Sequence, residues 1–150
     1  MNRTPTRPPA PLLAGLRRVM AEPWVLLFFG LVFVVSQSAI AVILHRIGPI
    51  DFLRLQCWAF TAEDCREQFA RWRAEGLLAL YRAHLVVDRW HGLWYAILLM
   101  AALARLMDKA GVSHRGDWLL LLPAAAGLAD ALENQFQAIF LAGPGLATIV

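Results

Sequence analysis

The sequence predicts an all-α membrane protein with three transmembrane helices and one amphipathic helix at the membrane surface. Hydrophobic residues make up 59% of the 150 residues and charged residues only 17%. With a mean hydropathy of +0.55, the chain is too apolar for an ordinary soluble domain. Several apolar runs approach the length needed to cross a hydrocarbon core of about 30 Å. We expect one integral-membrane domain over residues 1–150.

Charge and motifs exclude several classes of function. The net charge is only +3, and no basic stripe with interleaved aromatic residues occurs, so we expect no nucleic-acid partner. The sequence contains no glycine-rich phosphate loop, nucleophile elbow or zinc-binding helix motif. We therefore expect no cofactor, and the lipid bilayer is the expected partner.

The two cysteines, Cys57 and Cys65, are too few for a disulfide scaffold and lack C-x-x-C metal spacing. They can form a disulfide if both face the oxidising side of the membrane. Otherwise they serve as small apolar residues. The sequence leaves both alternatives open.

The first span is predicted over residues 24–45, after a cytoplasmic tail at residues 1–23 that ends in a short amphipathic piece. Its polar interruption, residues 36–38, has side chains that suit helix–helix contact in a membrane. A cleaved signal peptide ending near residue 41 is the alternative. The span is favoured because the apolar run continues past that point.

Residues 45–60 are expected to be a connection, because Gly48 and Pro49 stop the first helix. Thr61 and Asp64 have the spacing of a capping box that opens a helix over residues 61–75. The apolar side of that helix predicts a surface helix with this side in the lipid. A helix packed on a soluble lid is the alternative.

A long helix is predicted over residues 77–107, and it contains the second span. Its wholly apolar part, residues 93–104, is too short to cross the membrane, so the span must extend back to about residue 85. After a polar turn, the third span is predicted over residues 117–142, with a kink at Pro123.

Basic residues near the spans predict the orientation. Several arginines precede the first span, and Arg105, Lys109 and Arg115 lie between the second and third. Both regions are expected in the cytoplasm, which places the N-terminus inside and the protein in the inner membrane. The arginines of residues 61–88 would lie outside, where acidic residues balance them.

Two polar stripes form the candidate site. On the long helix, polar side chains recur at steps of three and four residues and share one face; they are Tyr81, His84, Asp88, His91 and Tyr95. The third span has a similar face with Asp130, Glu133, Asn134 and Gln137. Counting about 1.5 Å per residue from Arg105 and Asp117 places His91 level with Asp130, Asp88 with Glu133, and His84 with Gln137.

A buried polar cluster between these two helices has several interpretations. It can be a structural network that fixes the helix register. It can bind an ion or small ligand, or move protons. An enzyme that uses a His/carboxylate pair on a lipid-soluble substrate is a further alternative. So is an accessory subunit covered by a larger membrane complex or by a second copy of the chain.

Three segments resemble small uncharacterised bacterial polytopic integral-membrane proteins. The segments are residues 55–63, with an L-Q and F-T-x-E pattern, residues 81–88, and residues 128–134, with an Asp-x-x-Glu-Asn pattern. The resemblance implies a fold of about four spans and no assigned activity. A fourth span would begin near residues 146–150, and the chain departs from the pattern by ending there.

Overall fold

The computed structural model describes residues 11–58 and 61–142, without the side chains of residues 11, 57 and 58. Within these ranges all regular structure is helical, with six α-helices, one 3-10 helix and no strand. The elements are α1 (Pro11–Met20), α2 (Pro23–Ile47), α3 (Pro49–Trp58), α4 (Ala62–Ala74), α5 (Leu78–Lys109), the 3-10 helix η1 (His114–Leu120) and α6 (Leu121–Ala142).

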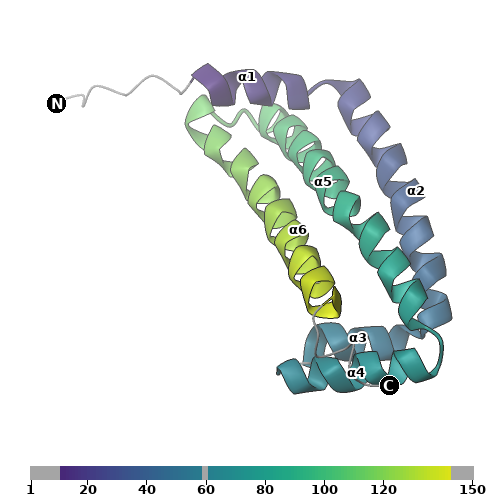
Figure 1. The fold of residues 1–150 in the computed structure, drawn as a ribbon. Helices are drawn as coiled ribbons and strands as arrows, with labels where there is room; N and C mark the ends of the chain where they lie inside the picture. The colour runs from purple at the N-terminus through teal and green to yellow at the C-terminus, as the bar shows by residue number, and fades with distance from the viewer. Residues whose placement is uncertain (1–10, 59–60, 143–150) are drawn as a thin grey trace, which may run out of the picture.

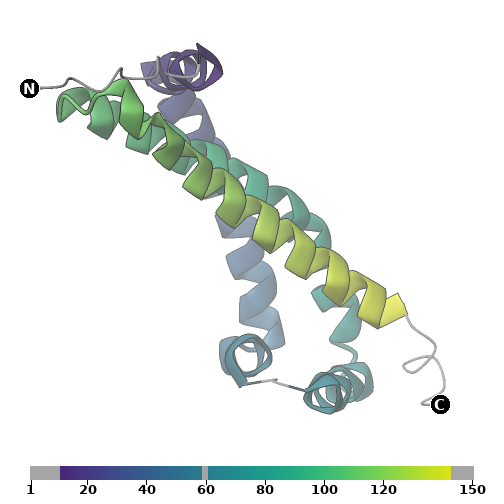
Figure 2. The same cartoon turned by 90° about the vertical axis from the view of Figure 1, so that its left-hand side faces the viewer.

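Three long helices form the body of the protein, and shorter helices lie across each end. Helix α5 lies between α2 and α6 and packs against both (Figure 1). Helix α1 lies across one end of the three, and α3 and α4 lie across the other. A quarter turn shows α5 and α6 running alongside each other while α2 crosses them at an angle (Figure 2).

Two of the described helices, α2 and α5, are long and apolar enough to cross a membrane. Helix α2 has 25 residues and α5 has 32. Helix α2 has Pro23 in its first turn, where the backbone N–H that proline lacks would have no partner within the helix. It ends at Gly48, whose φ of 102° is accessible mainly to glycine. The predicted helices over residues 24–45 and 77–107 are therefore confirmed as helices.

The prediction that residues 45–60 form only a connection is wrong, because α3 occupies most of them. Pro49 stops α2, as expected, but it also opens α3, since proline is favoured at the first position of a helix. The capping box that opens α4 is confirmed. The Thr61 hydroxyl accepts a hydrogen bond of 3.1 Å from the Asp64 amide, and Asp64 Oδ2 accepts one of 2.8 Å from the Thr61 amide.

The apolar side of α4 does not face lipid, contrary to the prediction. Phe69 and Trp72 are 2% and 0% exposed, and both pack against Tyr81 of α5, with ring centroids 5.3 and 4.8 Å apart. The unpredicted helix α3 and the ends of α5 and α6 provide the partners. This end of the molecule has its own hydrophobic core, which includes Ile47, Leu55 and Leu141.

The outer faces of the long helices are apolar and exposed. Leu27, Leu31 and Val35 of α2 are 73%, 65% and 62% exposed. In water, contiguous apolar surface of this kind marks a site of interaction with a membrane or another protein.

A second small core, formed by Ala104, Met107 and Leu120, lies under α1. Each end of the bundle therefore has a small hydrophobic core of its own.

Candidate functional site

Small residues bring α5 and α6 close together at the middle of the bundle. A β-carbon added to Gly127 would lie 2.7 Å from Ala96 Cβ and 2.7 Å from the carbonyl oxygen of Gly92. Helices in membranes commonly pack at small residues, because these let the backbones approach. Asp130 lies at the level of Gly92, so the register counted from the sequence is correct to within about one residue.

The two histidines of the predicted cluster contact helices other than α6. His91 is buried, and its Nδ1 lies 2.9 Å from the hydroxyl oxygen of Ser36 in α2. His84 is buried as well, with its ring 5.0 Å from that of Phe52 in α3. Among the described residues, no hydrogen bond joins His91 to Asp130 or His84 to Gln137, although Asp130 contacts Gly92, the residue after His91.

Several polar atoms of the cluster have no hydrogen-bond partner among the described residues. They are His84 Nδ1, Asp130 Oδ2 and Asn134 Nδ2, all buried. Asp88 and Tyr95 are half-buried. A structural network would be expected to satisfy each of its buried groups. The cluster as a whole does not have this property.

Only one part of the cluster forms a connected chain of side chains. The Tyr81 hydroxyl donates a hydrogen bond to Gln137 Oε1, and Gln137 Nε2 donates one of 2.9 Å to Glu133 Oε1. The chain begins in the core between α4 and α5 and ends at an exposed carboxylate. It fixes the orientation of the Gln137 amide and leaves the other oxygen of Glu133 available.

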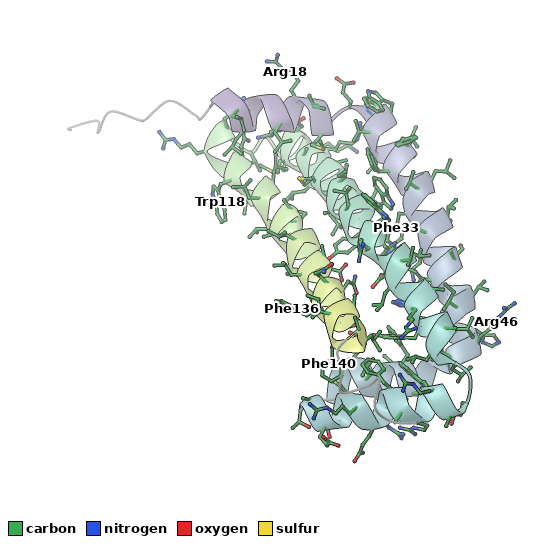
Figure 3. The ribbon with its side chains drawn as sticks, viewed as in Figure 1. Arg18, Phe33, Arg46, Trp118, Phe136 and Phe140 are labelled. Carbon is green, nitrogen blue, oxygen red and sulfur yellow. The ribbon has the colours of Figure 1, made fainter. Side chains whose placement is uncertain are left out.

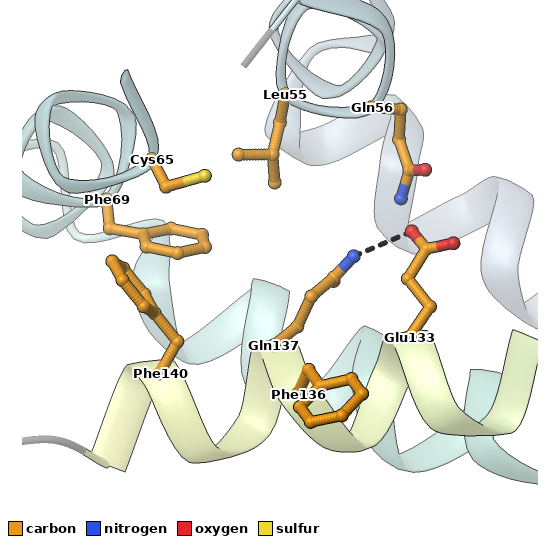
Figure 4. A pocket seen from close by; sticks show the side chains of 8 residues that line it. All are labelled: Leu55, Gln56, Cys65, Phe69, Glu133, Phe136, Gln137 and Phe140. Carbon is orange, nitrogen blue, oxygen red and sulfur yellow. Dashed lines mark hydrogen bonds between the residues drawn. The ribbon is translucent and has the colours of Figure 1, made fainter. Parts of the chain in front are cut away.

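That carboxylate faces a pocket of about 300 Å³ between α3, α4 and α6 (Figure 4). Glu133, Gln137 and Gln56 lie together at one end of the pocket. Apolar and aromatic side chains form the remainder, and these are Leu55, Cys65, Phe69, Phe136 and Phe140. Most ligand sites have this character, with apolar walls and a few polar groups that set orientation.

The charge in the pocket is unbalanced. Glu133 forms no ion pair with any described arginine, lysine or histidine. Arg66 lies over the Phe140 ring, with its guanidinium carbon 5.9 Å from the ring centroid, and pairs with Glu63 at 2.9 Å. The polar end therefore favours a cation or a hydrogen-bond donor.

Cys65 lines the same pocket from α4. Burial raises the pKa of its thiol, and the neighbouring charge of Asp64 raises it further. A thiol in this state is a poor nucleophile at neutral pH. The side chain of Cys57 lies outside the described residues, so the disulfide between Cys57 and Cys65 stays a prediction.

A metal site receives no support from the described residues. They contain no group of three or more His, Cys, Asp or Glu side chains that could hold a metal ion.

A second group of polar side chains, not predicted from the sequence, lies at the end of the bundle opposite the pocket. It joins α1 to α5 and η1. Arg17 is buried, and its guanidinium lies 2.6 Å from Asp108 Oδ1 and 2.8 Å from Asp117 Oδ1. It also donates to the Val112 carbonyl at 3.0 Å. His114 Nδ1 lies 2.9 Å from the other oxygen of Asp117.

The electrostatics of this group are those of a strongly coupled ion pair. The hydrogen bond with Asp117 raises the pKa of Arg17 despite its burial. Burial alone would raise the pKa of Asp117, but hydrogen bonds and charge from Arg17 and His114 outweigh it and lower that pKa below its usual value. The sequence signal is weak, because Arg17 is one of several arginines that precede the first span.

Comparison with known protein families, curated proteins and solved structures finds no match to this chain.

Proposed function

We propose that the protein is a three-span inner-membrane protein that binds a cationic amphipathic molecule in the pocket between α3, α4 and α6. The observation that carries the proposal is the pocket itself, with the unpaired carboxylate of Glu133 at one end and aromatic side chains at the other.

The exposed face of α6 supports its assignment as the third span. Apolar side chains recur along it at helical spacing, among them Leu128, Leu132, Phe136 and Ile139, which are 62%, 50%, 68% and 57% exposed. The polar residues of the helix lower its overall hydropathy, but Asn134 is buried and Gln137 half-buried toward the rest of the protein. Lipid would therefore contact a largely apolar surface.

Tryptophans and short helices support the position of the membrane surfaces. Trp24 and Trp118 begin α2 and the third span at the α1 end, and both are more than half exposed. Tryptophan is enriched at membrane–water interfaces. The layer of α3 and α4 lies at the other end (Figure 1). We propose that α1 lies on the cytoplasmic surface and that the α3–α4 layer lies on the outer surface.

The pocket then lies where lipid tails meet water, which favours an amphipathic ligand. Its aromatic end would contact the apolar part of the molecule, and Glu133 would accept hydrogen bonds from an ammonium or similar donor group. Phe136, exposed on the lipid side of α6 and on the pocket wall, marks a route from the bilayer (Figures 3 and 4).

An enzyme with a His/carboxylate pair is less well supported. Neither His84 nor His91 lines the pocket, and His91 is held by Ser36. General acid–base catalysis requires the acid or base within hydrogen-bond reach of the reacting group. Kinship with small bacterial polytopic membrane proteins remains part of the proposal, on the strength of the motif at residues 128–134.

Protection of Cys65 from alkylation tests the proposal. In a Cys57→Ser chain, purified in a neutral detergent, N-ethylmaleimide would react with Cys65 alone. Dodecylammonium should slow this reaction, because it would occupy the pocket beside the thiol, whereas dodecanoate should not. Glu133→Gln should remove the protection by dodecylammonium, since it removes the charge and keeps an acceptor for Gln137.

Glu67→Gln is the matched control, because it removes one exposed carboxylate of α4 that does not line the pocket. Protection in this variant should equal that of the parent. Equal protection by both amphiphiles, or protection that survives Glu133→Gln, would show that the pocket does not recognise the charge. No protection by either would show that the pocket does not bind such molecules.

A further inference from the structure

A second, separate groove lies on the outer side of the α5–α6 contact. It has a volume of about 240 Å³ and is lined by Arg82, Leu85, Val86, Arg89, Ala138, Leu141 and Ala142. Its floor is apolar, and both arginines come from α5. They are seven residues apart, so they lie on the same face of the helix about 10.5 Å apart along its axis.

The charge of the groove is entirely positive. No acidic side chain lines it, and neither Arg82 nor Arg89 forms an ion pair within the described ranges of the chain. Both side chains are exposed. The contact that Arg89 makes is a long hydrogen bond of 3.5 Å to Gln135 Oε1. Two unpaired guanidinium groups beside an apolar groove complement an anion that has an apolar part.

The depth of the groove agrees with a phospholipid headgroup. Arg82 lies in the second turn of α5, next to the α3–α4 layer, and Arg89 lies two turns deeper. Trp90, which follows Arg89, is 56% exposed, as is common at the boundary between headgroups and tails. Beyond the groove, exposed apolar side chains continue along both helices, among them Leu93 of α5 and Leu128 and Leu132 of α6.

We propose that this groove binds an anionic phospholipid, with its phosphate held by Arg82 and Arg89 and part of an acyl chain in the apolar floor. Basic pockets between membrane helices provide the same chemistry for anionic headgroups. The inference rests on the membrane placement proposed above. Retention of the protein in membranes after alkaline carbonate washing distinguishes a failure of that placement from a failure of the lipid site.

Native mass spectrometry of the full chain in neutral detergent tests the site. Dioleoyl phosphatidylglycerol and dioleoyl phosphatidylcholine share their acyl chains, so a preference for the first reports the headgroup. We expect the wild type to retain phosphatidylglycerol preferentially. Arg82→Gln and Arg89→Gln should each weaken its binding by about fivefold, and Arg82→Lys should retain more binding than Arg82→Gln.

Arg46→Gln is the control, because Arg46 is exposed near the same end of the bundle but on α2 (Figure 3). It should bind phosphatidylglycerol like the wild type. Equal binding of the two lipids, or unchanged binding in the double variant of Arg82 and Arg89, would overturn the proposal. Displacement of the lipid by excess inorganic phosphate alone would show a site for soluble phosphate, and would also overturn it.

Discussion

Gly92 of α5 and Asp130 of α6 lie in direct contact, and a β-carbon added to Gly92 would stand 2.5 Å from Asp130 Oδ2. The contact places a carboxylate beside helix backbone at the closest approach of the two helices. The absence of a side chain at Gly92 therefore determines how deeply Asp130 is held between them. The same crossing brings Gly127 to the backbone of α5.

Substitution of these glycines should separate the two helices. Gly127→Ala should lower the free energy of unfolding by about 1–3 kcal/mol, because its new methyl group would meet a backbone oxygen and the Ala96 β-carbon. Gly92→Ala should cost less, since the end of the Asp130 side chain can move. Thermal unfolding in detergent measures both.

Gly30→Ala provides the control, because its β-carbon would meet only Leu98 Cδ1, at an ordinary 3.8 Å. It should be neutral or slightly stabilising, since alanine favours helix over glycine. A Gly127→Ala variant as stable as Gly30→Ala would contradict the close packing of α5 on α6.

Ser36→Ala should destabilise the contact between α2 and α5 by about 0.6 kcal/mol, the average for a hydrogen bond between membrane helices. The hydroxyl of Ser36 is the partner of His91 Nδ1, at 2.9 Å. Ser38→Ala is the control, because Ser38 is exposed and bonds only to the Val34 carbonyl in its own helix. Equal melting temperatures for the two variants would argue against the Ser36–His91 bond.

The Arg17–Asp117 ion pair should make stability depend on pH under acidic conditions. The folded pKa of Asp117 lies below its ordinary value of 3.8, so the folded state binds this proton less readily than the unfolded state. The stabilisation is complete above the ordinary value and is lost as the pH falls through the lower folded value. Melting temperatures between about pH 6 and pH 3 would reveal the loss.

Asp117→Asn isolates this contribution, because the variant cannot lose the charge on acidification. It should be less stable than the wild type near neutral pH, by about 3 kcal/mol for a broken buried pair. The difference in the free energy of unfolding between the wild type and Asp117→Asn should become smaller as the pH falls. A constant difference across the range would contradict the assignment. Arg18→Gln, on the exposed side of α1, should behave like the wild type.

Local patterns in the sequence predicted local structure well. The Thr61–Asp64 capping box and the long helix over residues 77–107 depend on neighbours within one or two turns, and the structure contains both. The prediction of a connection in place of α3 is wrong because a proline can follow the end of one helix and also begin the next, as Pro49 does.

Long-range partners were harder to predict. Spacing along α5 places His84 and His91 on one face, but it does not show that these two side chains would contact α2 and α3. The apolar side of α4 faces protein for the same reason, since lipid and a buried core select the same side chains. Arg17 pairs with Asp108 and Asp117, which come from segments far along the chain. Local spacing in the sequence therefore does not predict this group of charges.

In the arrangement proposed above, α5 crosses the membrane and separates the α1 end of the protein from the α3–α4 layer and its pocket. The most direct test of this arrangement is labelling with an impermeant maleimide in cells that express the full chain. Both native cysteines are first changed to serine. Glu67→Cys then reports on α4 and Arg115→Cys on η1, and both positions are exposed. We predict that the first reacts in intact cells and the second only after the inner membrane is opened. Equal reaction of the two in intact cells would contradict this arrangement, and the reverse pattern would overturn the orientation.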